Sequence, residues 1–386
     1  MNFIRNYFDK IRPNFEEGGK LSAFHSVFDG LESFLIVPNE TSKSGVHIHD
    51  AIDSKRIMSM VVISLIPALL FGMYNVGYQN ALIVGKLAET SFFSMFLFGA
   101  LAVLPKIIVS YAVGLGIEFI WAQWKHEEIQ EGYLVSGILI PMIVPVQCPL
   151  WMLAIACAFA VIIGKEIFGG TGMNIFNPAL LARAFLFFSY PTKMSGDAVW
   201  VANDTIFGLG FTTPDGITAA TPLGILAQNG STGTDFWTSF IGLIPGSIGE
   251  TSVIAILIGA AILLWTGIAS WRIIVSVFLG GGLMAAFFHA IGMTPINWYE
   301  HLVLGGFCFG AVFMATDPVS SSRTETGKYI YGFFIGIVAV MVRVMNPGYP
   351  EGMMLAILLM NMFASTIDYF VVDANIRRRA KRSTKQ

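Results

Sequence analysis

The sequence is poor in charged residues and in cysteine. Asp, Glu, Lys and Arg make up only 12% of its 386 residues, whereas soluble domains carry about 25%. The formal net charge of −2 gives no general attraction to nucleic acid. The three cysteines, Cys148, Cys157 and Cys308, form no Cys-x-x-Cys pair and no metal-binding spacing. We expect them to be buried small hydrophobic residues.

Motifs for several kinds of chemistry are also missing. The glycine-rich stretch at 169–172 is not followed by Gly-Lys-Ser/Thr, so it is not a phosphate-binding loop. The sequence contains no dinucleotide-binding fingerprint and no cysteine set for an iron–sulfur cluster. His47, His49 and Asp50 alternate in a polar region, where we expect no metal site. These absences indicate that the chain oxidises no nicotinamide cofactor by itself.

Long apolar runs are abundant. Hydrophobic residues form 55% of the chain, and several runs reach the ~18–20 residues that cross a bilayer as a helix. They do not alternate as the strands of a membrane barrel do. We therefore predict an all-α polytopic membrane protein with about ten transmembrane segments. The expected segments are 57–78, 92–124, 133–145, 149–168, 174–191, 252–269, 272–292, 301–316, 328–345 and 352–372.

The segments divide into two similar halves. The stretch "YLVSGILIPMIVPVQCP" resembles "HLVLGGFCFGAVFMATDP", since both are short, contain glycine and end at proline. Likewise, "GGTGMNIFNPALLARAF" and "RVMNPGYPEGMMLAILL" both place Asn-Pro near the start of a segment. An odd number of segments in each half would insert the halves with opposite orientation. The pattern predicts two inverted five-segment repeats with short or broken helices near the midplane.

Charge sets the expected orientation. The basic ending "RRRAKRSTKQ" is typical of the cytoplasmic side, and an even number of segments places the N-terminus there too. The long central loop has one basic residue, Lys193, against five acidic residues, and we expect it outside. The predicted divisions are a cytoplasmic extension (1–56), a first membrane repeat (57–191), an external loop (192–250), a second membrane repeat (251–372) and a basic cytoplasmic tail (373–386).

The external loop contains a segment of small residues and threonines, "PDGITAATPLG" at 214–224. Within it, Asp215, Thr218 and Thr221 resemble a flavinylation motif, in which the final threonine receives FMN through a phosphoester made by a separate transferase. Ala219 stands where the motif usually has glycine. Small neighbours in an exposed loop would give the transferase access to a weakly nucleophilic hydroxyl. We expect Pro222 to hold Thr221 extended and its side chain outward.

Nearly the whole chain from about residue 50 resembles the B subunits of the bacterial sodium-translocating NADH:quinone oxidoreductases, a family shared with the D subunits of the Rnf complexes. The stretches that carry the resemblance are "GKEIFGGTGMNIFNPALLARAFLFFSYP", "SGDAVWV", "FIGLIPGSIGETS", "HLVLGGF", "FMATDPVS" and "NPGYPEGMMLAIL". The resemblance implies covalent FMN on Thr221, non-covalent riboflavin, ubiquinone as substrate and Na⁺ as the transported ion.

Two carboxylates inside apolar segments are candidates for the sodium path. Glu118 lies in "VGLGIEFIW" and Asp368 in "ASTIDYF". Ionisable groups at such positions are costly and point to function, and hard cations prefer oxygen ligands. The resemblance also assigns Gly114 and Glu118 to the quinone region, although Leu115 replaces a second glycine there. For Asp368 the structural alternative is an interfacial residue that balances the basic tail.

Asn174 and Asn177 open the fifth expected segment. One interpretation is a helix cap with close packing of the neighbouring glycines. The interpretation implied by the resemblance is a binding site for riboflavin near the cytoplasmic side, because side-chain amides complement the polar edge of a flavin. The sequence leaves both open.

The leading functional interpretation is the inner-membrane core of a redox-driven sodium pump. Electrons would pass from FMN through riboflavin to ubiquinone. The implied partners are a second FMN-bearing subunit, an NADH-oxidising subunit with flavin and an iron–sulfur cluster, and a flavin transferase. Two alternatives remain open, an Rnf-type ferredoxin:NAD subunit and an inverted-repeat transporter without redox activity. A long N-terminal extension, present here, is usually absent from the Rnf subunit.

Overall fold

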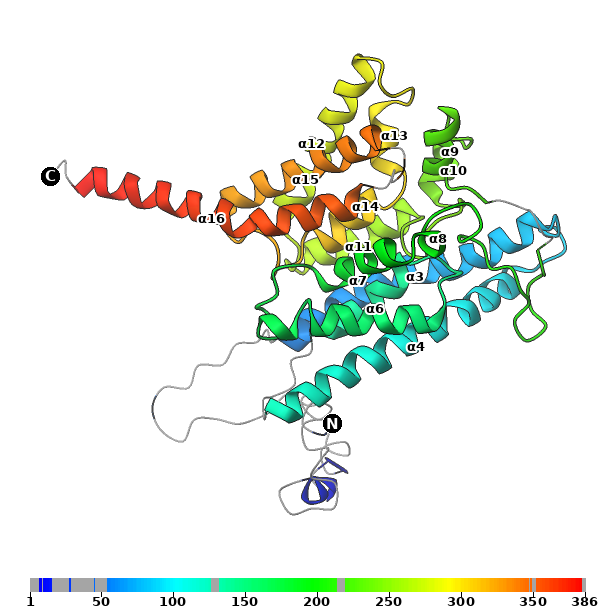
Figure 1. Ribbon diagram of the computed structural model, residues 1–386, viewed down its shortest axis with the longest axis horizontal. Coiled ribbons are helices and arrows are strands. Elements are labelled where there is room, and N and C mark those ends of the chain that lie inside the picture. Colours follow the sequence, from blue (N-terminus) through cyan, green and yellow to red (C-terminus); the bar gives the residue numbers. More distant parts are fainter. Residues whose placement is uncertain are drawn as a thin grey trace.

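The computed structural model describes most of the chain as a helical bundle (Figure 1). The described residues are 7–8, 10–15, 28, 45, 54–125, 132–213, 219–346, 348 and 352–383. Within these ranges the regular structure is helical, apart from an isolated bridge between Ile206 and Leu209. Six of the described helices are long and apolar enough to cross a membrane. The all-helical membrane class expected from the sequence is therefore confirmed.

The first half follows the expected segments closely. Its helices are α3 (Ser54–Ile83), α4 (Phe92–Lys125), α5 (Tyr133–Ile143), α6 (Leu150–Ile162), η3 (Glu166–Phe168), α7 (Pro178–Ser189) and α8 (Pro191–Met194). Helix α4 continues past Pro105 as a single element of 34 residues. At 1.5 Å per residue it is about 51 Å long, which exceeds the ~30 Å hydrocarbon core. A bilayer would accommodate it only if it tilts or projects beyond the core.

The second half contains two departures from the expected segments. Its helices are α11 (Val253–Trp265), α12 (Trp271–Ala290), α13 (Trp298–Val303), α14 (Phe307–Phe309), the π-helical η4 (Gly310–Met314), α15 (Glu325–Met345) and α16 (Met353–Ser383). The expected segment 301–316 is broken into three short pieces. Helix α16 continues through the basic residues, so the tail expected to begin at 373 is an extension of the last helix.

Side chains that cap helix starts explain several boundaries. The side-chain oxygens of Asn177, Thr221, Asp235, Ser252 and Thr324 each accept a hydrogen bond from a backbone N–H in the first turn that follows. Such caps satisfy amides that the helix itself leaves unbonded. In two cases the next residue is proline, whose fixed φ suits the first helical position. These boundaries are local properties of the sequence.

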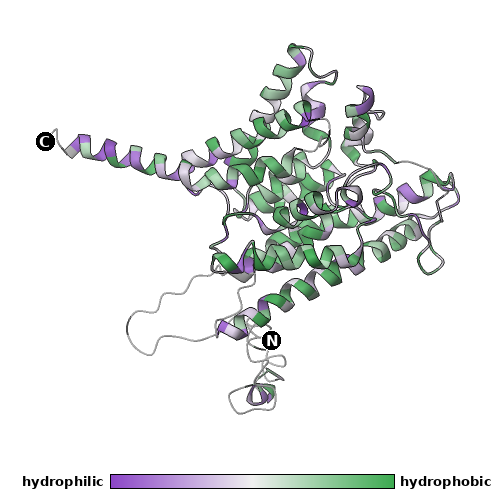
Figure 2. Cartoon of the chain, in the orientation of Figure 1, coloured by the Kyte–Doolittle hydropathy of each residue, from purple (hydrophilic) through white to green (hydrophobic). Residues whose placement is uncertain are grey.

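The short helix α5 and the consecutive short helices α14 and η4 lie in the buried centre of the bundle. Every residue of α14 and η4 is buried. Backbone N–H of Gly249 donates to the carbonyl of Met142 in α5 at 2.8 Å, and a Cβ at Gly249 would lie 3.2 Å from the Phe309 ring. The close approach of α5 and α14 therefore depends on glycine at this position. Figure 2 shows hydrophobic residues throughout the bundle and hydrophilic ones along the projecting end of α16.

The segment between the two halves is tied to one end of α3. It includes α9 (Pro222–Asn229) and α10 (Phe236–Ile241). Asn80 Nδ2 donates to the carbonyls of Ala202 and Phe211 at 2.9 and 2.8 Å, and its Oδ1 accepts from Phe211 N at 2.9 Å. Asn75 Nδ2 donates to the carbonyl of Ile244 at 2.9 Å. These buried amides fix the loop against the membrane helices.

Candidate functional site

Thr221 begins helix α9 in the segment between the two halves. Its backbone is extended (φ −66°, ψ 152°), as expected before Pro222. Its hydroxyl oxygen accepts a hydrogen bond from Gly224 N at 3.1 Å and caps the helix. The side chain is half-buried and is engaged in this cap, whereas the sequence suggested a side chain turned fully outward. The physical reason is that the cap satisfies a backbone amide that would otherwise lack a partner.

A small pocket of ≈ 30 Å³ adjoins Thr221 and is also lined by Glu250, Thr251 and Gly305. Glu250 Oε1 accepts a hydrogen bond from Arg183 Nη1 at 2.7 Å, and both side chains are only 7% exposed. The buried hydroxyl of Thr251 has no hydrogen-bond partner within the described part of the chain. The pocket wall therefore includes one member of a buried ion pair, Glu250, and the Thr251 hydroxyl, which lacks a partner among the described residues.

Two other residues of the predicted motif, Asp215 and Thr218, lie outside the described residues. Ala219 is the first described residue after them, and its backbone N–H donates to the carbonyl of Asp197 at 3.0 Å. This bond holds the residues before Thr221 against the beginning of the same loop. His47, His49 and Asp50 also fall outside the described residues.

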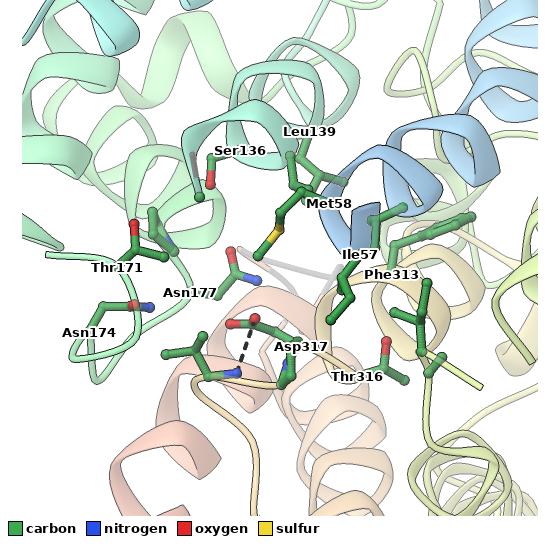
Figure 3. Close-up of a pocket in the computed structure, with 18 of the residues that line it drawn as sticks. Ile57, Met58, Ser136, Leu139, Thr171, Asn174, Asn177, Phe313, Thr316 and Asp317 are labelled. Atoms are coloured by element: carbon green, nitrogen blue, oxygen red, sulfur yellow. Dashed lines mark hydrogen bonds between the residues drawn. The ribbon is translucent and has the colours of Figure 1, made fainter. Parts of the chain in front are cut away.

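A second, larger cavity of ≈ 80 Å³ lies at the other end of α3 (Figure 3). Its apolar wall includes Ile57 and Met58 at the start of α3, and Phe313 in η4. Its polar wall consists of residues from four different segments, which are Ser136, Lys165, Thr171, Asn174, Asn177, Thr316 and Asp317. The cavity thus joins both halves of the bundle around one mixed surface.

The two asparagines predicted at this site are both buried and both line the cavity. Asn177 Oδ1 accepts from Ala179 N at 3.0 Å and from Leu180 N at 3.4 Å, so the helix cap is formed. Asn174 Nδ2 donates to the carbonyl of Phe176 at 2.9 Å. Nearby, the buried hydroxyl of Thr171 has no hydrogen-bond partner among the residues that the structure describes. The cavity wall therefore includes a residue whose hydroxyl lacks a partner in the described part of the chain.

Asp317 forms the opposite side of the cavity, just beyond η4. Its Oδ2 accepts from Ser320 Oγ at 2.6 Å, and its Oδ1 accepts from Val319 N at 3.4 Å. Burial raises the pKa of this carboxyl above its ordinary value, while these hydrogen bonds act in the opposite direction. Asp317 therefore lines the cavity and also caps the turn that follows it.

Gly114 and Glu118 lie one turn apart on the same face of α4. A Cβ at Gly114 would overlap the Tyr133 ring, so the absence of a side chain allows that ring to pack there. Tyr133 Oη is in turn 3.2 Å from Ser110 Oγ, one turn earlier on α4. Glu118 Oε1 forms a buried ion pair with Lys165 Nζ, which follows α6. The predicted quinone region is therefore a tightly packed contact of α4 with α5 and α6.

Asp368 caps the beginning of α15 from within α16. Its Oδ1 accepts from Ser322 Oγ at 2.5 Å, Thr324 N at 3.0 Å and Thr324 Oγ1 at 2.6 Å, while its Oδ2 accepts from Arg323 N at 2.7 Å. A carboxylate at a helix N-terminus is favoured by the helix dipole. The geometry supplies a structural role that neither sequence interpretation of Asp368 included.

The Thr221 pocket and the larger cavity lie at opposite ends of α3. Met58 lines the cavity. Ile244 lines the pocket, and its carbonyl accepts from Asn75. The stretch of α3 from Met58 to Asn75 extends about 26 Å at 1.5 Å per residue. Figure 1 accordingly shows α9 and α10 on the side of the bundle opposite the projecting end of α16.

Comparison with known proteins identifies the group of proteins to which this bundle belongs. The profile of the "NQR2, RnfD, RnfE family" matches residues 41–377. The chain belongs to the NQR2, RnfD, RnfE family. The match covers all of the candidate residues discussed above, from Gly114 to Asp368.

Several curated members of the NQR2, RnfD, RnfE family resemble the chain over almost their full length, and each is named as the B subunit of "Na(+)-translocating NADH-quinone reductase". The protein of Chromohalobacter salexigens is 47% identical over 407 residues, covering 98% of this chain and 96% of the relative. That of Ectopseudomonas mendocina is 44% identical over 411 residues, with 98% and 99% coverage. That of Pseudomonas aeruginosa is 43% identical over 411 residues, with the same coverage. The family expected from the sequence is confirmed.

Two contacts in this member of the NQR2, RnfD, RnfE family were not expected from the sequence, those of Tyr133 and of Lys106. The contact of Tyr133 with Gly114 could not be predicted from the sequence, which shows only that the tyrosine stands at the start of a short segment. Lys106 interrupts an apolar run, and its buried Nζ donates to the carbonyls of Val146 and Cys148 at 2.6 and 2.9 Å. A single charged residue in such a run is a usable signal of a buried polar contact.

Proposed function

We propose that the chain is the B subunit of a Na⁺-translocating NADH:quinone reductase, with covalent FMN on Thr221 and riboflavin in the cavity of Asn174 and Asn177. Electrons then cross the bundle from the Thr221 end to the cavity and reduce ubiquinone beside Gly114 and Glu118, and Na⁺ is exported. The observation that carries the proposal is the separation of two polar sites at opposite ends of α3, in a chain whose relatives carry this name.

The surroundings of Thr221 suit a phosphoester. The hydroxyl lies at the N-terminus of the eight-residue helix α9, where the helix dipole favours a phosphate group. Gly224 N already points at the hydroxyl oxygen. Gly224 N would remain a donor to the esterified oxygen or to the phosphoryl group, and the neighbouring pocket would receive part of the attached group. Asp215 and Thr218 complete the motif and are proposed to guide the transferase.

The residues around the cavity suit the polar edge of riboflavin. The buried hydroxyl of Thr171 needs a partner, and the side-chain amides of Asn174 and Asn177 supply both donors and acceptors. Met58 and Phe313 provide apolar contacts for the rings. A volume of ≈ 80 Å³ is small for three fused rings, so binding requires a flexible side chain such as Met58 to move. When bound, the flavins supply the electron-transfer chemistry.

The contact pattern of the helices supports ten segments in two inverted repeats. Helix α4 packs on α6, as α12 packs on α15; α6 packs on α7, as α15 packs on α16. The short helix α5 corresponds to α14 and η4, and these elements approach each other at Gly249. With the basic end of α16 in the cytoplasm, both termini lie inside and Thr221 lies on the outer face of the inner membrane.

The sodium path is proposed to use Glu118 and Asp368. The buried carboxylate of Glu118 has one oxygen, Oε2, without a hydrogen-bond partner among the described residues. Asp368 is surrounded by the hydroxyls of Ser322 and Thr324, whose oxygens are suitable ligands for a hard cation once their hydrogens turn away.

The proposal requires partners, because the sequence has no dinucleotide fingerprint and no cluster ligands. An NADH-oxidising subunit with flavin and an iron–sulfur cluster, a second FMN-bearing subunit and a flavin transferase would supply what this chain lacks. The remaining alternatives are an Rnf-type subunit and a transporter without redox activity.

Two measurements test the proposal. The denatured and washed protein band from the native host should fluoresce yellow-green under ultraviolet light, and a dark band would contradict a covalent flavin. Membranes that contain the complex should reduce quinone with NADH faster in Na⁺ than in K⁺. A requirement for ferredoxin instead of quinone would favour the Rnf-type alternative.

A further inference from the structure

The Glu118–Lys165 ion pair is buried deeply between α4 and the end of α6. The side chains are 3% and 5% exposed. Burying two charges carries a large desolvation penalty, and pairing compensates for it only when the remaining polar atoms are also satisfied. Glu118 does not meet that condition, because its Oε2 is buried without a hydrogen-bond partner in the described part of the molecule. The carboxylate therefore has an unused oxygen beside the ammonium.

Lys165 also belongs to the wall of the larger cavity. It follows the last turn of α6, where its backbone N–H donates to the carbonyl of Val161 at 3.2 Å. Thr171, Asn174 and Asn177 line the same cavity. A lysine side chain is a compact charge on a flexible four-carbon stem. Lys165 thus adjoins both the carboxylate and the space proposed for riboflavin.

We propose that the Lys165 ammonium is shared between Glu118 and the cavity and couples reduction in the cavity to Na⁺ binding at Glu118. With the cavity uncharged, Lys165 pairs with Glu118 and also lies 3.9 Å from the carboxylate of Glu166. An electron that arrives through the partner subunits adds one negative charge in the cavity and attracts the ammonium. The freed carboxylate then takes one Na⁺ from solution, so each added electron is balanced by one cation and no covalent bond changes. This inference rests on the proposed function.

Linkage makes the coupling reciprocal. If reduction strengthens Na⁺ binding by a given factor, Na⁺ must make reduction more favourable by the same factor. We expect a factor of about tenfold, within the usual range for coupled sites. For a one-electron step, tenfold corresponds to a rise in midpoint potential of about 59 mV. Both sides of the linkage can be measured without following turnover.

The experiment uses the purified complex that contains this chain. Redox titration of the riboflavin, resolved from the flavin of the NADH-oxidising subunit, in Na⁺ and in K⁺ gives the Na⁺ dependence of its potential. Stabilisation of the oxidised complex against heat by Na⁺, relative to K⁺, reports sodium affinity. Lys165→Gln should abolish the Na⁺ dependence of the potential and tighten Na⁺ binding to the oxidised form about tenfold, because the competitor of Na⁺ is gone. Lys165→Arg should retain part of the coupling.

Two further variants separate coupling from simple loss of a buried charge. Glu118→Gln should raise the flavin potential in both salts, because Lys165 is then released to the cavity. Lys106→Gln removes another buried lysine, which lies on the same helix as Glu118 and donates to the carbonyls of Val146 and Cys148. It should lower stability while the Na⁺ dependence of the flavin potential persists.

The outcomes distinguish the inference from the proposed function. If Lys165→Gln leaves both the Na⁺ dependence of the potential and the Na⁺ affinity as in the parent complex, the shared-cation role is wrong. If acid extraction of the parent complex releases no riboflavin, as distinct from the flavin of the NADH-oxidising subunit, the assignment of the cavity fails. The Na⁺ affinity of the Lys165→Gln complex still decides whether Lys165 competes with Na⁺ for Glu118.

Discussion

The two ends of the bundle differ in how they would hold a flavin. At the Thr221 end the pocket is ≈ 30 Å³ and the threonine is half-buried, so little surface is available to retain a free ligand. At the other end the cavity is ≈ 80 Å³ and is enclosed by both halves of the chain. Affinity for a small ligand depends on the surface that it buries. If the proposed flavins occupy these two sites, a covalent bond would be needed at the first end and dispensable at the second.

The largest expected effect is at Thr221. Thr221→Ala should remove covalent FMN completely, because the phosphoester requires the hydroxyl, and should cost about 1 kcal/mol through loss of the α9 cap. Thr221→Ser should retain the cap and some flavin. Peptide mass mapping locates the FMN, with exposed Thr212→Ala as a control that keeps it. FMN that persists in Thr221→Ala and disappears in Thr218→Ala would move the attachment to Thr218.

The ion pair beneath the Thr221 pocket should give the next largest effect. Arg183→Met leaves the Glu250 carboxylate buried without its 2.7 Å partner, and breaking such a pair typically costs about 3–5 kcal/mol. Removing both charges in Arg183→Met/Glu250→Leu should restore much of the stability, since neither member of this pair is then left as a buried charge without the other. Thermal unfolding of the purified complex measures the difference. A double variant as unstable as the single one would show that Glu250 is not the source of the loss.

The two roles of Asn177 in the cavity can be separated by a matched pair of substitutions. Asn177→Asp keeps an oxygen that caps α7 but loses the amide donor, so riboflavin content should fall while the cap remains. Asn177→Ala should lose both and should cost about 1 kcal/mol in addition. Acid extraction measures the flavin, and thermal unfolding measures the cap. If Asn177→Asp and the parent protein contain equal amounts of riboflavin, Asn177 caps α7 but does not bind the flavin.

The smallest effect is expected for Asp317. Burial raises its pKa in the folded chain, so the stability that its protonation contributes is present at pH below the ordinary carboxyl value of about 3.9. It is lost as the pH rises through the raised folded pKa. Asp317→Asn removes the charge and keeps one oxygen acceptor, which can serve either Ser320 or Val319. As the pH rises, the melting temperature of Asp317→Asn should increase relative to that of the parent protein. A difference in melting temperature that does not change with pH would contradict a raised pKa for Asp317.

Local features of the fold were predictable from the sequence, and long-range pairings were not. The Asn177-Pro178 and Thr221-Pro222 steps mark helix starts because capping and proline geometry act within one turn. The pairs Glu118–Lys165 and Arg183–Glu250 join residues 47 and 67 positions apart. No periodicity encodes which buried charges meet, since that depends on how whole helices pack. For the same reason the sequence did not predict that Asp368 caps α15.

The cap at Thr221 has a consequence for the order of events during biogenesis. A hydroxyl that holds Gly224 N at 3.1 Å is already engaged when α9 is folded. Releasing it costs about 1 kcal/mol, so only a minority of folded loops present a free hydroxyl at any moment. We therefore expect the transferase to act fastest on newly exported chains, before α9 closes. Helix α9 would then fold after the phosphoester has formed, so that attachment of FMN precedes folding of the loop.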